Sequence, residues 1–207
     1  MAVSNHTIAR LTRYRQVLQH YQQYNTDFIY SDEIASSLHL TAARVRKDLS
    51  ILKISGRKKA GYPIQALLSA FDRILDSERP HTAVVVGSNP LGLALARDPL
   101  FSANKIRITA VFGDKPPAGS AAAKIPVRPL RALVAYVKQH RTGHAILAAT
   151  DPGAQRAMDH ILLSGIRSVL SLSPLELKVP QDCVVSRINL VHEFEKLVYY
   201  THESRHP

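Results

Sequence analysis

A dense group of cationic side chains between residues 44 and 59 offers the chemistry of a polyanion-binding site. The stretch contains seven basic residues and a single acid, Asp48. Arginine binds the edge of guanine through two hydrogen bonds, and lysine neutralises phosphates. A solvated charged surface is the ordinary explanation of such a run, but this one coincides with a structural motif. The basic residues are Arg44, Arg46, Lys47, Lys53, Arg57, Lys58 and Lys59.

The elements around these cations predict a winged helix-turn-helix. A first helix over 7–24 carries apolar residues at helical spacing. We expect Ser31 to cap a second helix and Thr41 to cap a third over 42–52, which carries arginines near its start and would enter the major groove of DNA. The basic segment 53–62 contains glycine and predicts the wing. The side chains expected to contact DNA are Arg10, Ser31, Thr41, Arg44, Arg46, Lys47, Ser50, Arg57, Lys58, Lys59 and Tyr62.

A second motif follows the short apolar strand predicted over 82–86, and it resembles a phosphate-binding turn. A strand followed by GxGxxG and a helix places nucleotide phosphates at the helix N-terminus. Here the middle glycine is replaced by Asn89, whose side chain occupies the place of the ligand, and Pro90 has no N–H group. A purely structural turn therefore remains an alternative. The candidate cofactor-binding residues are Gly87, Ser88, Asn89, Pro90, Leu91 and Gly92, with Asp114 as either a ribose contact or an ordinary turn residue.

The rest of the chain alternates strands and helices, which is typical of a doubly wound parallel sheet. The fold class is therefore α/β: an N-terminal winged helix-turn-helix domain followed by a Rossmann-like doubly wound parallel sheet with a C-terminal dimer helix. Strands are predicted at 82–86, 106–112, 145–149, 168–172 and 184–188. Because Pro80 stops the preceding helix, we expect domains at 1–79 (DNA binding), 80–188 (dinucleotide binding) and 189–207 (a swapped or self-packed helix).

Composition narrows the functional classes. The chain has 207 residues and a formal net charge of +11, which favours two small domains and a polyanionic partner. No apolar run approaches the roughly 18 residues of a bilayer span, and the N-terminus lacks a signal-peptide core, so we expect a cytoplasmic protein with no membrane partner. The scattered histidines and the lone Cys183 have no metal-ligand spacing, and no GxSxG or Walker motif is present. We therefore expect no catalytic or metal-binding residues, and no enzyme.

Several segments, taken in order from residue 7 to residue 200, resemble the redox-sensing transcriptional repressor family Rex. The resemblance implies a homodimer that binds a palindromic double-stranded DNA operator when NADH is scarce and leaves it when NADH rises. It also implies NAD(H) as the cofactor and a C-terminal helix exchanged between subunits. The segments are 7–11, 45–50, 56–62, 87–92, 125–127, 164–166 and 179–182, of which 45–50 is the most specific.

Three departures from the family pattern fall at the expected ligand site. Asn89 replaces a glycine, Gly113 replaces an aspartate at the end of a strand, and Asn189 replaces an aspartate at the start of the last helix. The wing also has Lys59 in place of a glycine. The first hypothesis is a repressor that responds to the NADH/NAD+ balance, and the second is a related regulator with a degenerate cofactor site that senses another ligand or none. An NAD-dependent enzyme or CoA-binding module is the third, and the lack of a catalytic acid–base pair disfavours it.

Overall fold

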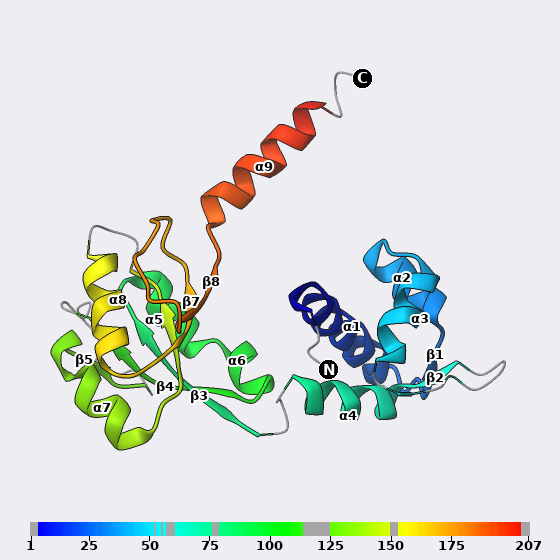
Figure 1. The fold of residues 1–207 in the computed structure, drawn as a ribbon, viewed down its shortest axis with the longest axis horizontal. Coiled ribbons are helices and arrows are strands. Elements are labelled where there is room, and N and C mark those ends of the chain that lie inside the picture. The colour runs from blue at the N-terminus through cyan, green and yellow to red at the C-terminus, as the bar shows by residue number, and fades with distance from the viewer. Residues whose placement is uncertain are drawn as a thin grey trace. The chain divides into compact units, whose positions relative to one another are not determined.

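The chain forms two compact units, Met1–Arg79 and Pro80–Pro207. The α/β class predicted from the sequence is confirmed, with helices in the first unit and a parallel sheet flanked by helices in the second (Figure 1). Among the residues described, no helix is long and apolar enough to cross a membrane. The structure is a computed structural model, and it describes residues 4–51, 53–54, 56, 61–75, 79–113, 125–149 and 153–203.

The first unit packs helices around a single apolar core. Leu11, Tyr14 and Leu18 are fully buried, and their spacing of three or four residues places them on one face of the first helix. A short antiparallel ribbon closes the unit and forms the base of the predicted wing. Its elements are α1 (Asn5–Gln23), β1 (Phe28–Ile29), α2 (Ser31–Leu38), α3 (Ala42–Ser50), β2 (Tyr62–Pro63) and α4 (Ile64–Ile74).

The helix caps agree with the sequence prediction at α3 and differ at α2. The Thr41 hydroxyl accepts a hydrogen bond from the Arg44 N–H at 3.2 Å, so the predicted cap of α3 is confirmed. The prediction that Ser31 caps α2 is wrong, because Ser31 is the first helical residue and Tyr30 is the cap. The Glu33 carboxylate accepts from the Tyr30 N–H at 2.7 Å and fixes the start of α2 one residue earlier.

The second unit is built on six parallel strands in the order β5-β4-β3-β6-β7-β8. The chain first moves from β3 towards one edge and then returns to continue on the other side of β3. In open α/β sheets, such a switch point leaves a crevice at the carboxyl ends of the two central strands, where ligands bind. The strands are β3 (His81–Val86), β4 (Ile106–Phe112), β5 (Val127–Arg128), β6 (His144–Leu147), β7 (Ser168–Ser171) and β8 (Val184–Arg187).

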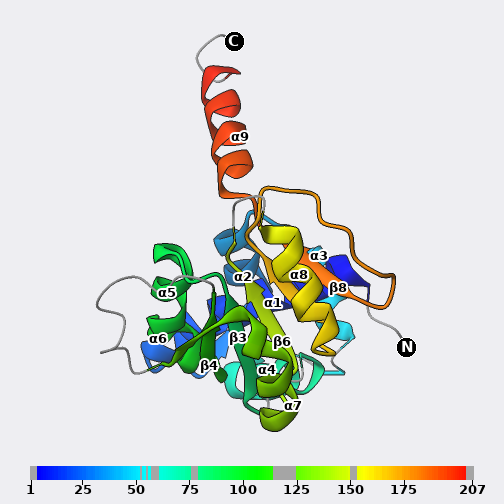
Figure 2. The same cartoon turned by 90° about the vertical axis from the view of Figure 1, so that its left-hand side faces the viewer.

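Helices cover both faces of this sheet (Figure 2). Val84 and Val86 of β3 pack in the cluster that contains α7 and α8 residues, whereas Val85 packs in the cluster with α5 and α6. This alternation follows from the two-residue period of a strand and explains why residues 83–86 of β3 are all apolar. The helices are α5 (Pro90–Arg97), α6 (Pro99–Ala103), η2 (Leu130–Ala132), α7 (Leu133–His140) and α8 (Ala154–Leu163).

The last helix, α9 (Leu190–Glu203), extends away from the sheet (Figure 1). Its apolar side chains are exposed in the single chain. Leu190, Phe194 and Leu197 are each 60% exposed or more. An amphipathic helix with an uncovered apolar face needs a partner surface to be stable. The sequence predicted this segment as a dimer helix, and that role stays a prediction.

Candidate nucleic-acid interface and nucleotide turn

The exposed face of α3 presents the predicted DNA-binding cations. Arg44, Arg46 and Lys47 are exposed, whereas Val45 and Leu49 are buried in the core. The helical period separates the two sets, so the apolar stripe fixes the helix on its unit and turns the cations to solvent. The surface of α3 can therefore meet a polyanion without unfolding any part of the unit.

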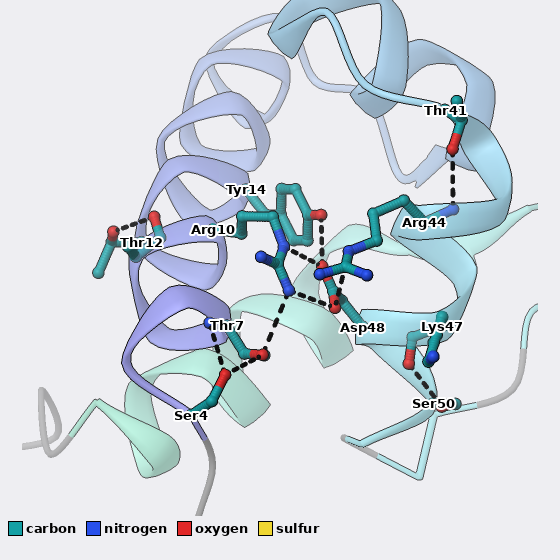
Figure 3. A network of polar contacts seen from close by, with 11 residues as sticks. Ser4, Thr7, Arg10, Thr12, Tyr14, Thr41, Arg44, Lys47, Asp48 and Ser50 are labelled. Atoms are coloured by element: carbon teal, nitrogen blue, oxygen red, sulfur yellow. Dashed lines mark hydrogen bonds and ion pairs between the residues drawn. The ribbon is translucent and has the colours of Figure 1, made fainter.

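A buried carboxylate, Asp48, holds α3 against α1 (Figure 3). Arg10 on α1 donates to Asp48 from both Nε and Nη2, the latter at 2.8 Å from Oδ1. The Tyr14 hydroxyl donates to Asp48 Oδ2 at 2.8 Å. Two-point pairing of a guanidinium with a carboxylate fixes both distance and orientation. The network therefore sets the position of α3 from behind its exposed face.

The pKa values of Tyr14 and Asp48 reflect this network. Burial raises the pKa of Tyr14 to about 12, and its hydrogen bond to Asp48 acts in the same direction. Burial alone would raise the pKa of Asp48, but hydrogen bonds from Arg10 and Tyr14 and the charges of Arg10 and Arg44 hold it below its ordinary value. Asp48 is therefore ionised, and Tyr14 protonated, throughout the physiological range.

Arg46 is oriented by the start of α2. Its Nη1 donates to the Ser31 hydroxyl at 3.0 Å and lies 3.8 Å from an Asp32 carboxylate oxygen. Ser31 itself is buried, with 8% of its surface exposed. A guanidinium has five N–H donors, so this contact orients Arg46 and leaves it donors for a further acceptor. Ser31 thus lies behind Arg46, where it positions that side chain.

The structure brings together some predicted DNA-contacting residues and separates others. Arg10 lies within the Asp48 network, with 15% of its side chain exposed. The Ser50 hydroxyl donates to the Lys47 carbonyl at 2.6 Å and remains on the exposed face. Tyr62 is half-buried at the base of the wing, where its ring limits the space beside Gly56. Arg57, Lys58 and Lys59 lie outside the described residues.

The turn between β3 and α5 has the tight backbone packing of a nucleotide-binding turn. Gly87 has a φ of +129°, and a Cβ there would lie 2.7 Å from the Ala149 nitrogen. A Cβ at Gly92 would lie 2.0 Å from the Gly87 carbonyl oxygen. Both glycines are therefore required by close approach, as expected for the first and third positions of GxGxxG. The backbone frame of the predicted site is present.

The hydrogen-bond donors of this turn are largely used by the protein itself. Asn89 is the N-cap of α5, and its Oδ1 accepts from the Gly92 N–H at 2.8 Å. Its Nδ2 donates to the Ala148 carbonyl, also at 2.8 Å. Pro90 contributes no donor, so Leu91 carries the one first-turn N–H group that these contacts leave. The turn as it stands does not fit a dinucleotide pyrophosphate, which needs several such groups.

The end of β4 is also filled by the protein. A Cβ on Gly113 would lie 2.2 Å from the Ser88 hydroxyl oxygen and 2.9 Å from the Ser88 nitrogen. An acidic residue at this position, the usual ribose contact in a dinucleotide site, has no room beside Ser88. Asp114 lies outside the described residues. Sequence reasoning missed the contact between Ser88 and Gly113, because nothing in either residue type indicates that they touch.

A helical first unit followed by a parallel sheet is also the architecture of solved Rex-family structures. Residues 2–50 match the family model described as "Putative DNA-binding protein N-terminus". The redox-sensing transcriptional repressor Rex of Chloroflexus aggregans (strain MD-66 / DSM 9485) is 31% identical, over 93% of this chain and 92% of its own. That of Leuconostoc citreum (strain KM20) is 30% identical, over 94% and 90%. The chain therefore belongs to the Rex family of redox-sensing transcriptional repressors.

A solved structure of the protein RSP in complex with β-NAD+ and operator DNA has the same fold. It superposes with a TM-score of 0.89 and covers 99% of this chain and 95% of its own. The two sequences are 23% identical, so this comparison establishes the shared architecture alone.

Proposed function

We propose that this chain is a transcriptional repressor that binds duplex DNA through the exposed face of α3. The observation that carries the proposal is the combination of exposed Arg44, Arg46 and Lys47 with the buried Asp48 that anchors their helix. Groove-binding helices need cations on one face and a rigid scaffold behind it. Arginines near the start of α3 suit base edges, and lysines suit phosphates.

Each predicted DNA-binding residue has a role in this proposal. Arg44 and Arg46 contact bases, and Lys47 with the wing residues Arg57, Lys58 and Lys59 neutralises phosphates. Thr41 and Ser50 contribute hydroxyls from the exposed face of α3. The remaining three, Arg10, Ser31 and Tyr62, act by positioning. Arg10 and Ser31 hydrogen-bond to side chains of α3, and Tyr62 is half-buried in β2 beside Gly56.

The repressor acts as a homodimer on a palindromic operator in the cytoplasm, where it serves as a regulator and carries out no catalysis. A palindrome presents two equivalent half-sites, which two copies of α3 read together. The uncovered apolar face of α9 supports an association of two chains through this helix, because a second copy would remove Leu190, Phe194 and Leu197 from water. Asn189 caps α9 by accepting from the Val191 and His192 N–H groups at 3.1 and 3.2 Å.

The response to the NADH/NAD+ balance is the second part of the proposal. Family membership and the β-NAD+ in the RSP complex support NAD(H) as the ligand of the second unit. When bound, the cofactor would act as the signal. Its affinity would differ between the arrangement of the dimer that fits DNA and the arrangement that does not. With the Asn89 side chain displaced from the Gly92 N–H, Gly87, Gly92, Ser88 and Leu91 would line its site at the switch point, with Asp114 as the candidate ribose contact.

A second candidate function is favoured by the bonds of Asn89. A repressor of this family in which the turn is occupied by its own side chain would bind the operator without regard to NADH, and would sense another ligand or none. The two candidates share the DNA-binding surface and differ in the second unit alone.

One experiment separates them and tests the DNA-binding proposal at the same time. Fluorescence anisotropy with a labelled pool of palindromic duplexes, in low salt, should show binding of the full-length protein. Titrating NADH into that complex to millimolar concentration should release DNA if the first candidate holds, and leave it bound if the second does. Failure to bind any duplex in low salt would overturn both.

A further inference from the structure

We infer that the Asn89 side chain is an intramolecular competitor for the pyrophosphate of a dinucleotide, and that it sets the affinity of this chain for NAD(H). The inference deepens the proposed function, on which it rests for the identity of the ligand. Asn89 alone then decides whether this turn is open or closed to a phosphate group.

The Asn89 side chain lies at the N-terminus of α5, where a phosphate would bind. Its Oδ1 accepts from the Gly92 N–H at 2.8 Å, which is the bond that a phosphate oxygen at this helix N-terminus would accept. A phosphate and the side chain cannot both occupy that donor. Binding of a dinucleotide therefore requires Asn89 to leave.

The Asn89 side chain is also held by a second hydrogen bond. Its Nδ2 donates to the carbonyl of Ala148, which directly follows β6. The Ala148 N–H in turn donates to the Val86 carbonyl at 2.8 Å, at the end of β3. A cap needs only the bond to the helix, so the second bond ties the amide to the ends of both central strands. The side chain thus lies across the switch point of the sheet.

The start of α5 is already capped without a ligand. Pro90 at the first helical position sets the backbone for α5, and Asn89 satisfies the orphan donor at Gly92. Nothing in the turn depends on a bound anion to hold it in place. A dinucleotide must replace two existing hydrogen bonds before it gains any.

The test is the dissociation constant for NADH, measured by its fluorescence, in the full-length protein and two variants. Asn89→Gly removes the competitor, and glycine at a helix N-cap is tolerated well enough for the turn to fold. We expect it to bind NADH at least about tenfold more tightly, which corresponds to about 1.4 kcal/mol. Asn89→Asp keeps an acceptor for the Gly92 N–H and loses the donor to the Ala148 carbonyl, and it places a carboxylate where the phosphate must lie. We expect it to weaken or abolish binding.

A matched control is Asn104→Gly, which makes the same substitution at the end of α6. There the side-chain amide donates to the Leu100 carbonyl at 2.8 Å, so one amide hydrogen bond is lost outside the turn. We expect its NADH affinity to equal that of the wild type. Unchanged or weaker NADH binding in Asn89→Gly, or wild-type affinity in Asn89→Asp, would overturn the inference.

Operator binding of each protein in the absence of NADH is the independent readout. All three variants should bind the operator as the wild type does, because none lies in the DNA-binding unit. A protein that binds the operator normally while Asn89→Gly gains no NADH affinity would refute the inference and leave the proposed repressor intact. Loss of operator binding by the wild type itself would instead remove the function on which the inference rests.

Discussion

The two units of this chain use hydrogen-bonded polar side chains in opposite ways. In the first unit, Asp48 is held by Arg10 and Tyr14 behind α3, and the arginines on the far face of that helix stay exposed. In the second unit, the Asn89 side chain accepts a hydrogen bond from the Gly92 N–H at the start of α5 and so occupies that donor. A polar group that braces a helix from behind preserves its binding surface, whereas one that caps its start removes part of that surface.

Removing the Asp48 carboxylate, which holds α3 against α1, should have the largest effect, a loss of stability. Asp48→Ala leaves the Arg10 guanidinium and the Tyr14 hydroxyl without their shared acceptor in a nearly closed site. We expect a loss of about 3 kcal/mol in the free energy of unfolding, at the lower end for a broken buried pair because Arg10 is partly exposed. Urea unfolding followed by circular dichroism measures it.

The control for Asp48→Ala is Asp72→Ala in the same unit. Asp72 lies 3.4 Å from Arg15, with 28% of its side chain exposed, so the pair is partly screened by water. We expect it to change the unfolding free energy by less than about 1 kcal/mol. Equal losses of unfolding free energy in the two alanine variants would show that the Asp48 network stabilises the unit no more than the Arg15–Asp72 pair does.

Removing a cation from the exposed face of α3 should weaken DNA binding and leave the free energy of unfolding unchanged. Arg46→Ala should weaken operator binding by roughly 1–3 kcal/mol if Arg46 contacts a base. Arg107→Ala removes the same charge from the exposed side of β4 and should leave affinity nearly unchanged. Anisotropy titrations on one operator measure both, and equal affinities for Arg46→Ala and Arg107→Ala would remove Arg46 from the interface.

Restoring the usual ribose carboxylate should fail in the second unit, because the space is already filled. Gly113→Asp would place its Cβ 2.2 Å from the Ser88 hydroxyl oxygen, and overpacking of this kind costs about 1–3 kcal/mol of stability. We expect a lower thermal midpoint with no gain in NADH affinity. Gly143→Asp, where a Cβ would meet nothing within 4 Å, should leave the midpoint near that of the wild type.

Lowering the pH should destabilise the two units at different pH values. We expect this loss of stability to be smaller than the effects of the substitutions above. Burial and the nearby His81 lower the pKa of His144 below its ordinary value of 6.5, so the unfolded state takes up a proton first and stability falls as the pH drops below 6.5. The pKa of Asp48 is also lowered, but from 3.8, so its contribution is lost only as the pH falls below that value.

The pH difference can be measured by native-state hydrogen exchange of the β3 and β6 amides at pH 7.5 and 5.5, corrected for intrinsic rates. His144→Gln should abolish the part of the pH dependence that arises from this pair. His192→Gln, on the exposed α9, should retain it. Identical pH dependence in the wild type and His144→Gln would assign the effect to other groups.

The sequence predicted features whose signal is local. The alternation of strands and helices gave the α/β class, and Thr41 before a basic helix gave the cap of α3. The prediction for Ser31 was one residue off, because Glu33 pairs with the Tyr30 backbone and moves the cap. The strands β1 and β5 were missed since each has two residues, too few for a period to be visible.

Long-range contacts at the candidate sites could not be predicted in the same way. Asp48 was visible as the single acid in a basic run, but its pairing with Arg10 joins residues 38 positions apart. The place of Asn89 across the ends of β3 and β6 depends on a bond to Ala148, 59 positions away. Such contacts arise from the packing of the whole unit, which residue types and spacing do not specify.

The link from Arg10 and Tyr14 to Asp48 has a genetic consequence. These side chains are at the rear of the DNA-reading helix, yet the direction in which its arginines project depends on them. A screen for clones that lose repression, with protein levels checked by immunoblot, should therefore yield alleles in the middle of the first helix as well as alleles on the operator-facing surface.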